Sequence, residues 1–268
     1  MDEKIDSFQH ATQVFTPSAE TLEKAWIKDY DKAYAESIKD VPGFWDKAAR
    51  ELEWFSPWTK VLEWDYPWAK WFVGATCNIT HNCLDRHLTT WRRNKAALIW
   101  VGEDDTDRVY TYGELHHQVC RCANALKALG IRKGDRVAIY LPKIPEQTVA
   151  MLACARIGAI HTVVYSGFSA PALASRIEDS RPRVIITADV GFDRGKVIQL
   201  KTVVNQAVAS SPSIEKVVVV RRQKPAIPLS GPKEIDWNDW LKCEKTACPP
   251  EVMDAEDPLY FLYTSGTT

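Results

Sequence analysis

The distribution of apolar residues changes character near residue 94. Beyond it, short continuous apolar runs, such as residues 184–186 and 217–220, alternate with longer segments in which apolar residues recur every three or four positions. Continuous runs are typical of strands buried on both faces of a sheet, and the three-to-four spacing is typical of helices with one apolar face. The pattern predicts a three-layer α/β body with a mostly parallel sheet flanked by helices.

The individual elements of this body follow from the same pattern. Predicted strands cover residues 96–101, 108–110, 136–141, 160–165, 183–188, 216–221 and 259–263. Predicted helices cover residues 144–157, 170–180 and 201–210. A further helix is predicted from a Thr111 cap to Leu129, and Gly130 ends it. The Gly-Glu-Asp-Asp segment at residues 102–105 is expected to turn between the first two strands, which then form a hairpin.

The first part of the chain predicts a helical extension over residues 1–93, ahead of the α/β body over residues 94–268. Ser18 can cap a helix whose apolar positions recur at helical spacing. Five tryptophans then lie among prolines between residues 54 and 71: Trp54, Trp58, Trp64, Trp68 and Trp71. Two interpretations stay open: a stacking platform for bases or sugars, and an aromatic pad that clamps the extension onto the body. The absence of an accompanying basic groove favours the pad.

Composition and charge restrict the functional class. Hydrophobic residues make up 46% and charged residues 26% of the 268, values that argue against a disordered or fibrous chain. The net charge of -1 gives no field that would hold a nucleic acid. Seven cysteines, without a CxxC pair, favour reduced thiols. With neither a signal-peptide pattern nor a long apolar window, we expect a cytoplasmic protein with no membrane or nucleic-acid partner.

Several common catalytic and nucleotide-binding motifs are absent from the sequence. It contains no GxGxxG, no GxxxxGK[ST], no HExxH and no GxSxG. His116 and His117 are adjacent on a predicted helix, where their side chains diverge by about a hundred degrees and are poorly placed to chelate one metal. We therefore assign no metal ligand and no catalytic residue in this chain.

The end of the sequence is the most informative feature. The predicted strand 259–263 runs directly into Thr264-Ser265-Gly266-Thr267-Thr268. A strand that opens into a glycine-containing hydroxyl loop offers backbone N–H groups and short donors to an anion, as phosphate-binding loops do. An ordinary polar turn or a frayed tail is the alternative.

Together with other segments, this ending resembles a known family, the acyl-adenylate-forming synthetases, and among them the AMP-forming acetyl-CoA synthetases. In that family a run similar to residues 263–268 starts the phosphate loop. Further matching segments occur in the expected order, at residues 71–74, 82–87, 111–115, 151–159, 165–169 and 194–198. The matches cover most of residues 40–268.

The resemblance implies a two-step reaction. ATP and a short carboxylate such as acetate form an acyl-adenylate and release pyrophosphate, and the thiol of CoA then displaces AMP. The cofactors and small-molecule partners are thus ATP, CoA, Mg²⁺ and the carboxylate. ATP phosphate-binding residues are carried over as Thr264, Ser265, Gly266, Thr267 and Thr268. Gly266 would let the backbone approach the phosphates closely.

The same resemblance implies a CoA site. Its residues are Ser166, Gly167, Asp193, Arg194, Gly195 and Lys196. The chain departs from the family twice, because Ser166-Gly167 replaces the usual glycine pair and Asp193 stands where an arginine is often found. An aspartate repels a phosphate, so we expect Arg194 and Lys196 to make the contacts and Asp193 to turn away.

The family's acyl pocket, adenine-binding strand, metal-binding glutamate and catalytic lysine fall beyond Thr268. The sequence is therefore interpreted as an N-terminal fragment that is inactive as a ligase on its own. The alternative function is a non-enzymatic α/β binding or interaction module that docks a partner through its Trp-rich N-terminal region. Acyl-chain preference and oligomeric state are not indicated by the sequence.

Overall fold

A computed structural model describes residues 15–103, 105–242 and 244–264. The chain divides into two compact units, residues 1–51 and 52–268, and each is described by itself. The first unit contains helices α2 (Ala19–Lys24), α3 (Tyr30–Lys39) and α4 (Val41–Ala49). Each begins at a side-chain cap, in which an oxygen of Ser18, Asp29 or Asp40 accepts a backbone N–H of the first turn.

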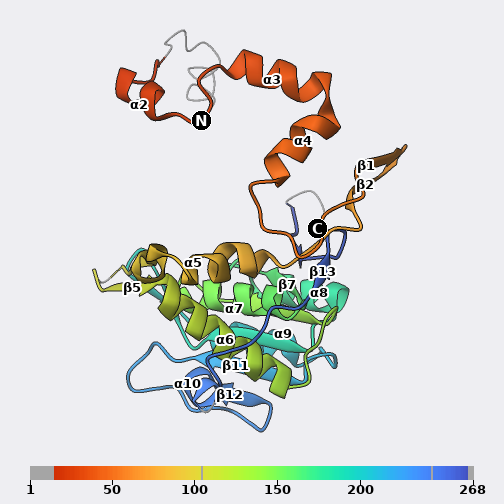
Figure 1. The fold of residues 1–268 in the computed structure, drawn as a ribbon. Helices are drawn as coiled ribbons and strands as arrows, with labels where there is room; N and C mark the ends of the chain where they lie inside the picture. Colours follow the sequence, from red (N-terminus) through yellow and green to blue (C-terminus); the bar gives the residue numbers. More distant parts are fainter. Residues whose placement is uncertain (1–14, 104, 243, 265–268) are drawn as a thin grey trace, which may run out of the picture. The chain divides into compact units, whose positions relative to one another are not determined.

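A six-stranded parallel sheet forms the centre of the second unit (Figure 1). Its order is β12-β11-β8-β6-β7-β14, and every neighbouring pair in it is parallel. The strands are β6 (Arg136–Tyr140), β7 (Ile160–Val163), β8 (Val184–Ala188), β11 (Lys216–Val220), β12 (Glu234–Asp236) and β14 (Tyr260–Phe261). The predicted parallel sheet is confirmed, and four of its members are the strands expected at residues 136–221.

Helices cover both faces of this sheet. They are α6 (Tyr112–Ala128), α7 (Pro145–Arg156), α8 (Ala170–Ser180), α9 (Leu200–Val208) and the short α10 (Trp237–Leu241). Helix α7 links β6 to β7, and α8 links β7 back past β6 to β8. Because such crossovers are right-handed, α7 and α8 lie on opposite faces. Helix α6 packs beside α7, and α9 beside α8, which gives the predicted three layers.

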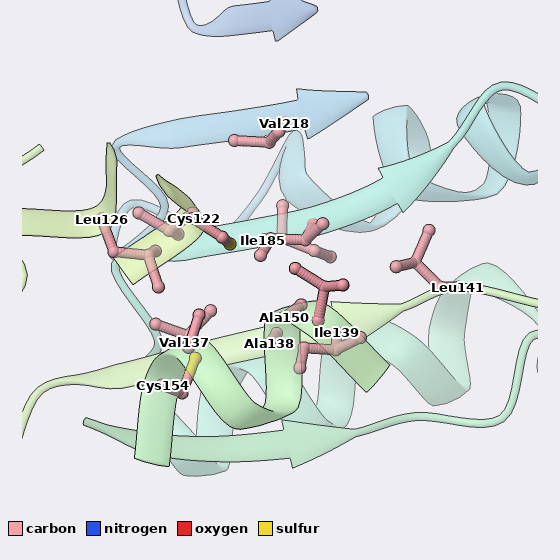
Figure 2. Packing of buried hydrophobic residues seen from close by; sticks show 14 of the residues in the cluster. Cys122, Leu126, Val137, Ala138, Ile139, Leu141, Ala150, Cys154, Ile185 and Val218 are labelled. Atoms are coloured by element: carbon pink, nitrogen blue, oxygen red, sulfur yellow. The ribbon is translucent and has the colours of Figure 1, made fainter. Parts of the chain in front are cut away.

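The core fills the space between α6, α7 and the central strands (Figure 2). Cys122 and Leu126 of α6, Ala150 of α7, Ile139 of β6 and Ile185 of β8 are all fully buried there. Burial on both faces explains the continuous apolar runs of the central strands. At the start of α6, Thr111 and Glu114 form a capping box, as the predicted Thr111 cap requires.

In the described part of the chain, four antiparallel strand pairs accompany the central sheet. The hairpin predicted after residue 94 is confirmed as β4 (Ala96–Val101) with β5 (Asp107–Thr111), although Asp104 of its turn lies outside the described residues. The others are β9 (Gly191–Asp193) with β10 (Lys196–Ile198), β1 (Lys60–Asp65) with β2 (Trp68–Val73), and β3 (Thr76–Cys77) with β13 (Met253–Asp254). Short helical turns link β3 to β4: η1 (His81–Asp85), α5 (Arg86–Leu88) and η2 (Trp91–Asn94).

The strands between residues 60 and 77 correct the expectation of a helical extension over residues 1–93. Valine, tryptophan and phenylalanine favour strands, and Tyr66-Pro67 supplies the turn between β1 and β2. The division of the chain at residue 93 stays a prediction. The rings of Trp54, Trp58 and Phe72 lie 5.2–5.3 Å apart between centroids, which is the geometry of packed aromatics.

Across the described ranges, no helix has the length and apolar character needed to cross a membrane.

Candidate functional site

The order of strands creates a crevice at one edge of the sheet. From the central strand β6 the chain goes to β7 on one side, and then crosses to β8 on the other side. The loops that follow β6 and β8 therefore diverge at the carboxyl ends of these two strands. Open α/β sheets bind their ligands at such a topological switch point.

A pocket of about 560 Å³ occupies this place. It is lined by residues that follow four neighbouring parallel strands: residues 142–144 after β6, 165–167 after β7, 191–193 after β8, and Arg222 after β11. Residues 100–103 of the β4–β5 hairpin, together with Ile198 and Leu200, complete the lining. Three predicted CoA-site residues, Ser166, Gly167 and Asp193, are thereby brought together.

Tyr140 fixes the loop that carries Ser166 and Gly167. Its hydroxyl lies 2.9 Å from the carbonyl oxygen of Ser166 and 2.8 Å from that of Phe168, and it donates to them. Burial raises the pKa of Tyr140 to about 12, so the phenol stays protonated and remains a donor at neutral pH. A Cβ at Gly167 would come within 2.4 Å of the exposed Tyr165 ring, so any larger residue there would displace that ring.

Asp189 joins the loops that follow β8 and β11. It is fully buried, and its carboxylate accepts backbone N–H groups from Val190 at 2.7 Å, Arg222 at 2.8 Å and Gln223 at 3.2 Å. The guanidinium of Arg222 lies over the Phe192 ring, 4.7 Å from its centroid. A flat, positively charged wall of the pocket results from this pair.

The β9–β10 hairpin carries the other predicted CoA-site residues. Arg194 and Gly195 form its two-residue turn with φ of 51° and 73°, as a type I′ turn requires. Their N–H groups donate to the carboxylate of Glu103 at 3.0 and 3.3 Å. These two donors are therefore already engaged by an anion of the protein itself.

The β9–β10 turn sets where the charged residues of this hairpin lie. Asp193 is among the residues that line the pocket, and Arg194 and Lys196 are not. The two-residue turn puts Arg194 at the tip and pairs Asp193 with Lys196 across the two strands. That Arg194 and Lys196 make the contacts to CoA stays a prediction. At the exposed mouth of the pocket the carboxylate of Asp193 remains accessible to solvent.

The lining residues that were not predicted as site residues include Trp100, Lys143, Phe192 and Arg222. The indole Nε1 of Trp100 donates to the carbonyl oxygen of Lys143 at 2.7 Å, which ties the β4–β5 hairpin to the loop after β6. The predicted strand ends held a usable signal, because Lys143, Phe192 and Arg222 each follow a predicted parallel strand within a few residues, and parallel strand ends meet at one edge.

The expected phosphate loop begins at the same edge. Strand β14 is parallel to β7 and next to it, and Thr264 follows β14 as an exposed residue. The predicted Ser265, Gly266, Thr267 and Thr268 lie outside the described residues.

Helix α8 connects this ending with the loop after β7. The guanidinium of Arg176 lies over the rings of Phe168 and Tyr263, at 4.5 and 5.3 Å from their centroids. The hydroxyl of Tyr263 donates to Asp179 across 2.5 Å. The approach to Thr264 is thus held by side chains of α8.

These features define a class of protein: an α/β protein with a pocket at the carboxyl edge of a parallel sheet and two candidate binding loops on neighbouring strands. The chain belongs to the family of AMP-binding enzymes, whose family description matches residues 84–268. Residues 30–83 match a second family, described as the acetyl-coenzyme A synthetase N-terminus. The resemblance inferred from the sequence motifs is thereby confirmed.

Individual relatives agree with this family. The chain is 48% identical over 250 residues to an acetyl-coenzyme A synthetase of Syntrophus aciditrophicus, covering 91% of this chain and 38% of the relative. It is also 50% identical over 243 residues to an acetyl-coenzyme A synthetase of Syntrophobacter fumaroxidans, covering 89% of this chain and 37% of the relative. The chain therefore spans about two-fifths of the length of these relatives.

A solved structure shares the fold. The acetoacetyl-CoA synthetase from Streptomyces lividans superposes with a TM-score of 0.83 at 28% identity, over 94% of this chain and 41% of that one.

Proposed function

We propose that this chain is the N-terminal portion of an AMP-forming acetate–CoA ligase and contributes its CoA pocket and the start of its ATP phosphate loop. The observation that carries the proposal is the pocket at the switch point, which unites Ser166, Gly167 and Asp193 in a chain of the AMP-binding family. In the proposed reaction, a carboxylate attacks the α-phosphate of ATP and pyrophosphate leaves. The CoA thiol then displaces AMP and forms the thioester.

In the first step, negative charge accumulates on the leaving pyrophosphate. Donors fixed around that charge lower the barrier, because they need no reorganisation during the reaction. We assign this role to Thr264, Ser265, Gly266, Thr267 and Thr268. The support is the position of Thr264 after β14, at the edge where the CoA pocket also opens.

In the second step, CoA has to be held with its thiol directed toward the adenylate. We assign its binding to Ser166 and Gly167 on the loop that Tyr140 fixes, and to the hairpin segment 193–196. In that segment Arg194 and Lys196 supply positive charge, Gly195 completes the turn, and Asp193 opposes the phosphates. The loops after β7 and β14 follow neighbouring strands. Two ligands bound by these loops would meet at one edge of the sheet.

Mg²⁺ is expected as the counter-ion of ATP in this family. Within residues 15–103, 105–242 and 244–264, no three His, Cys, Asp or Glu side chains come together in a way that could hold a metal ion. We assign the ion no ligand in the described part of the chain and route no step through it.

We also propose that the protein works in the cytoplasm. Support comes from the six cysteines in the described residues, all of which are free thiols: Cys77, Cys83, Cys120, Cys122, Cys154 and Cys248.

Two measurements on the purified 268-residue chain test the proposal. Calorimetry should detect binding of CoA, and acetate-dependent exchange of pyrophosphate into ATP should be absent, because the chain spans only about two-fifths of its relatives. Exchange activity would contradict the predicted inactivity of the isolated chain. Absence of CoA binding, together with tight binding of a protein partner through the Trp-rich N-terminal region, would favour the interaction-module alternative.

A further inference from the structure

The charged residues that line the switch-point pocket are evenly divided. Lys143 and Arg222 are cationic, and Glu103 and Asp193 are anionic. Glu103 is engaged with the N–H groups of Arg194 and Gly195. These two backbone donors are consequently occupied, so positive charge for a phosphate that enters the pocket has to come from side-chain cations.

Lys143 is placed to be that cation. It lies three residues beyond the end of β6, at the point where the loops after β6 and β8 diverge. Its main chain is fixed by the 2.7 Å hydrogen bond from Trp100. The Trp100 ring is held in turn by the guanidinium of Arg108, 4.8 Å from the ring centroid, which pairs with Glu146 of α7 at 2.6 and 3.0 Å.

The ammonium group of Lys143 has no competing partner among the residues that the structure describes: its side chain is exposed and makes no hydrogen bond or ion pair with them. Arg222, by comparison, already lies against the Phe192 ring. A lysine on a fixed backbone with a free ammonium group is a mobile point charge that can follow a phosphate oxygen.

We infer that Lys143 binds a phosphate group of CoA in this pocket and offsets the negative charge of Asp193. The inference rests on the proposed function. It adds to the proposed CoA site a phosphate-binding residue that lies outside the β9–β10 hairpin. Asp193 stands where an arginine is often found in the family, so that position lacks a positive charge. Lys143 supplies a positive charge from the loop after β6.

The experiment compares three forms of the 268-residue chain by calorimetry at low ionic strength: wild type, K143Q, and K127Q as a control. Lys127 is also exposed, but it lies on α6 and does not line the pocket. We expect K143Q to weaken CoA binding by about five- to tenfold, the scale of one charge-assisted contact at a partly exposed site. K127Q should bind as wild type does. Added salt should lower the CoA affinity of K143Q less than it lowers the CoA affinity of wild type.

Pantetheine lacks the phosphates of CoA. Its binding therefore shows whether a variant has lost the contact with the phosphate charge or the shape of the pocket. Wild type and K143Q should bind it equally well, and D193N should bind CoA more tightly than wild type does. Wild-type affinity of K143Q for CoA, or an equal loss of CoA and pantetheine binding, would overturn the role of Lys143 and leave the proposed pocket intact. If wild type itself does not bind CoA, the proposed function fails instead. Unchanged melting temperatures verify that the variants are folded.

Discussion

Arg156 and Asp85 form a partly buried bidentate ion pair, in which both guanidinium–carboxylate contacts measure 2.8 Å. The side chain of Arg156 is only 2% exposed. Burial alone would raise the pKa of Asp85, but the hydrogen bonds from Arg156 and His116 outweigh it and hold that pKa well below its usual range. The pair joins η1 to the end of α7 and so anchors the segment that leads into the α/β body.

Removing one partner of this pair should destabilise the protein strongly. D85A leaves the Arg156 guanidinium buried without its counter-charge, so we expect the free energy of unfolding to fall by about 3–5 kcal/mol. The matched control is E215A, because Glu215 pairs with Arg183 at the surface with 51% of its side chain exposed. That variant should lose less than about 1 kcal/mol. Equal losses in urea unfolding of the two variants would contradict the prediction.

The same cluster should make stability depend on pH. The hydrogen bond to Asp85, followed by that to Cys120, raises the pKa of His116 to about 9, although burial and the nearby Arg156 charge act in the opposite direction. A histidine whose pKa is raised by folding stabilises the folded protein. This stabilisation is complete at a pH below the pKa of the unfolded state, and it is lost as the pH rises through the pKa of the folded state.

We therefore expect the stability from His116, about 3 kcal/mol at most, to disappear between about pH 6.5 and pH 9. Urea unfolding of wild type and H116Q across this range measures it. The difference between the two free energies of unfolding should shrink as the pH rises. A difference that stays constant would show that His116 titrates alike in the folded and unfolded states.

Much of the fold beyond residue 94 could be predicted, because the residues that are apolar in the sequence pattern are mostly the ones that are buried in the structure. Helix 170–180 was predicted with its observed bounds, since Ser169-Ala170-Pro171 marks its start and its apolar face keeps helical spacing. The β1–β2 hairpin was missed because its tryptophans and prolines were interpreted as an irregular aromatic pad. In the structure, Trp64 and Trp68 are 65% and 75% exposed. Because large apolar residues occupy exposed positions here, the sequence lacks the alternation of apolar and polar residues by which a strand is predicted.

The pocket was only partly predictable, for a topological reason. Ser166, Gly167 and Asp193 were identified through family resemblance, whereas Lys143 and Arg222 depend on which strands are neighbours. Strand β8 lies beside β6 rather than β7, and this order brings residues 143 and 193 to one pocket. The predicted elements leave several strand orders open, and only the packed sheet selects one of them.

Gly167 offers a test of the loop after β7. The methyl group of G167A would meet the Tyr165 ring, so the ring has to move. Tyr165 is 62% exposed and can do so, and we expect a loss of stability below about 1 kcal/mol with clearly weaker CoA binding. G231A is the control, because nothing lies within 4 Å of the added methyl group there. Calorimetry with CoA that gives the same affinity for both variants would exclude a role for this loop in binding.

The contact between Glu103 and the β9–β10 turn should be visible in amide exchange. Arg194 adopts a left-handed backbone conformation that costs free energy for a residue with a side chain, and Glu103 offsets this cost by accepting two N–H groups of the turn. In E103A, we expect the amides of Arg194 and Gly195 to exchange at least about fivefold faster, which corresponds to one lost hydrogen bond. E103Q keeps one acceptor oxygen and should give an intermediate rate. Exchange rates unchanged in E103A, measured by NMR, would mean that the turn holds its conformation without Glu103.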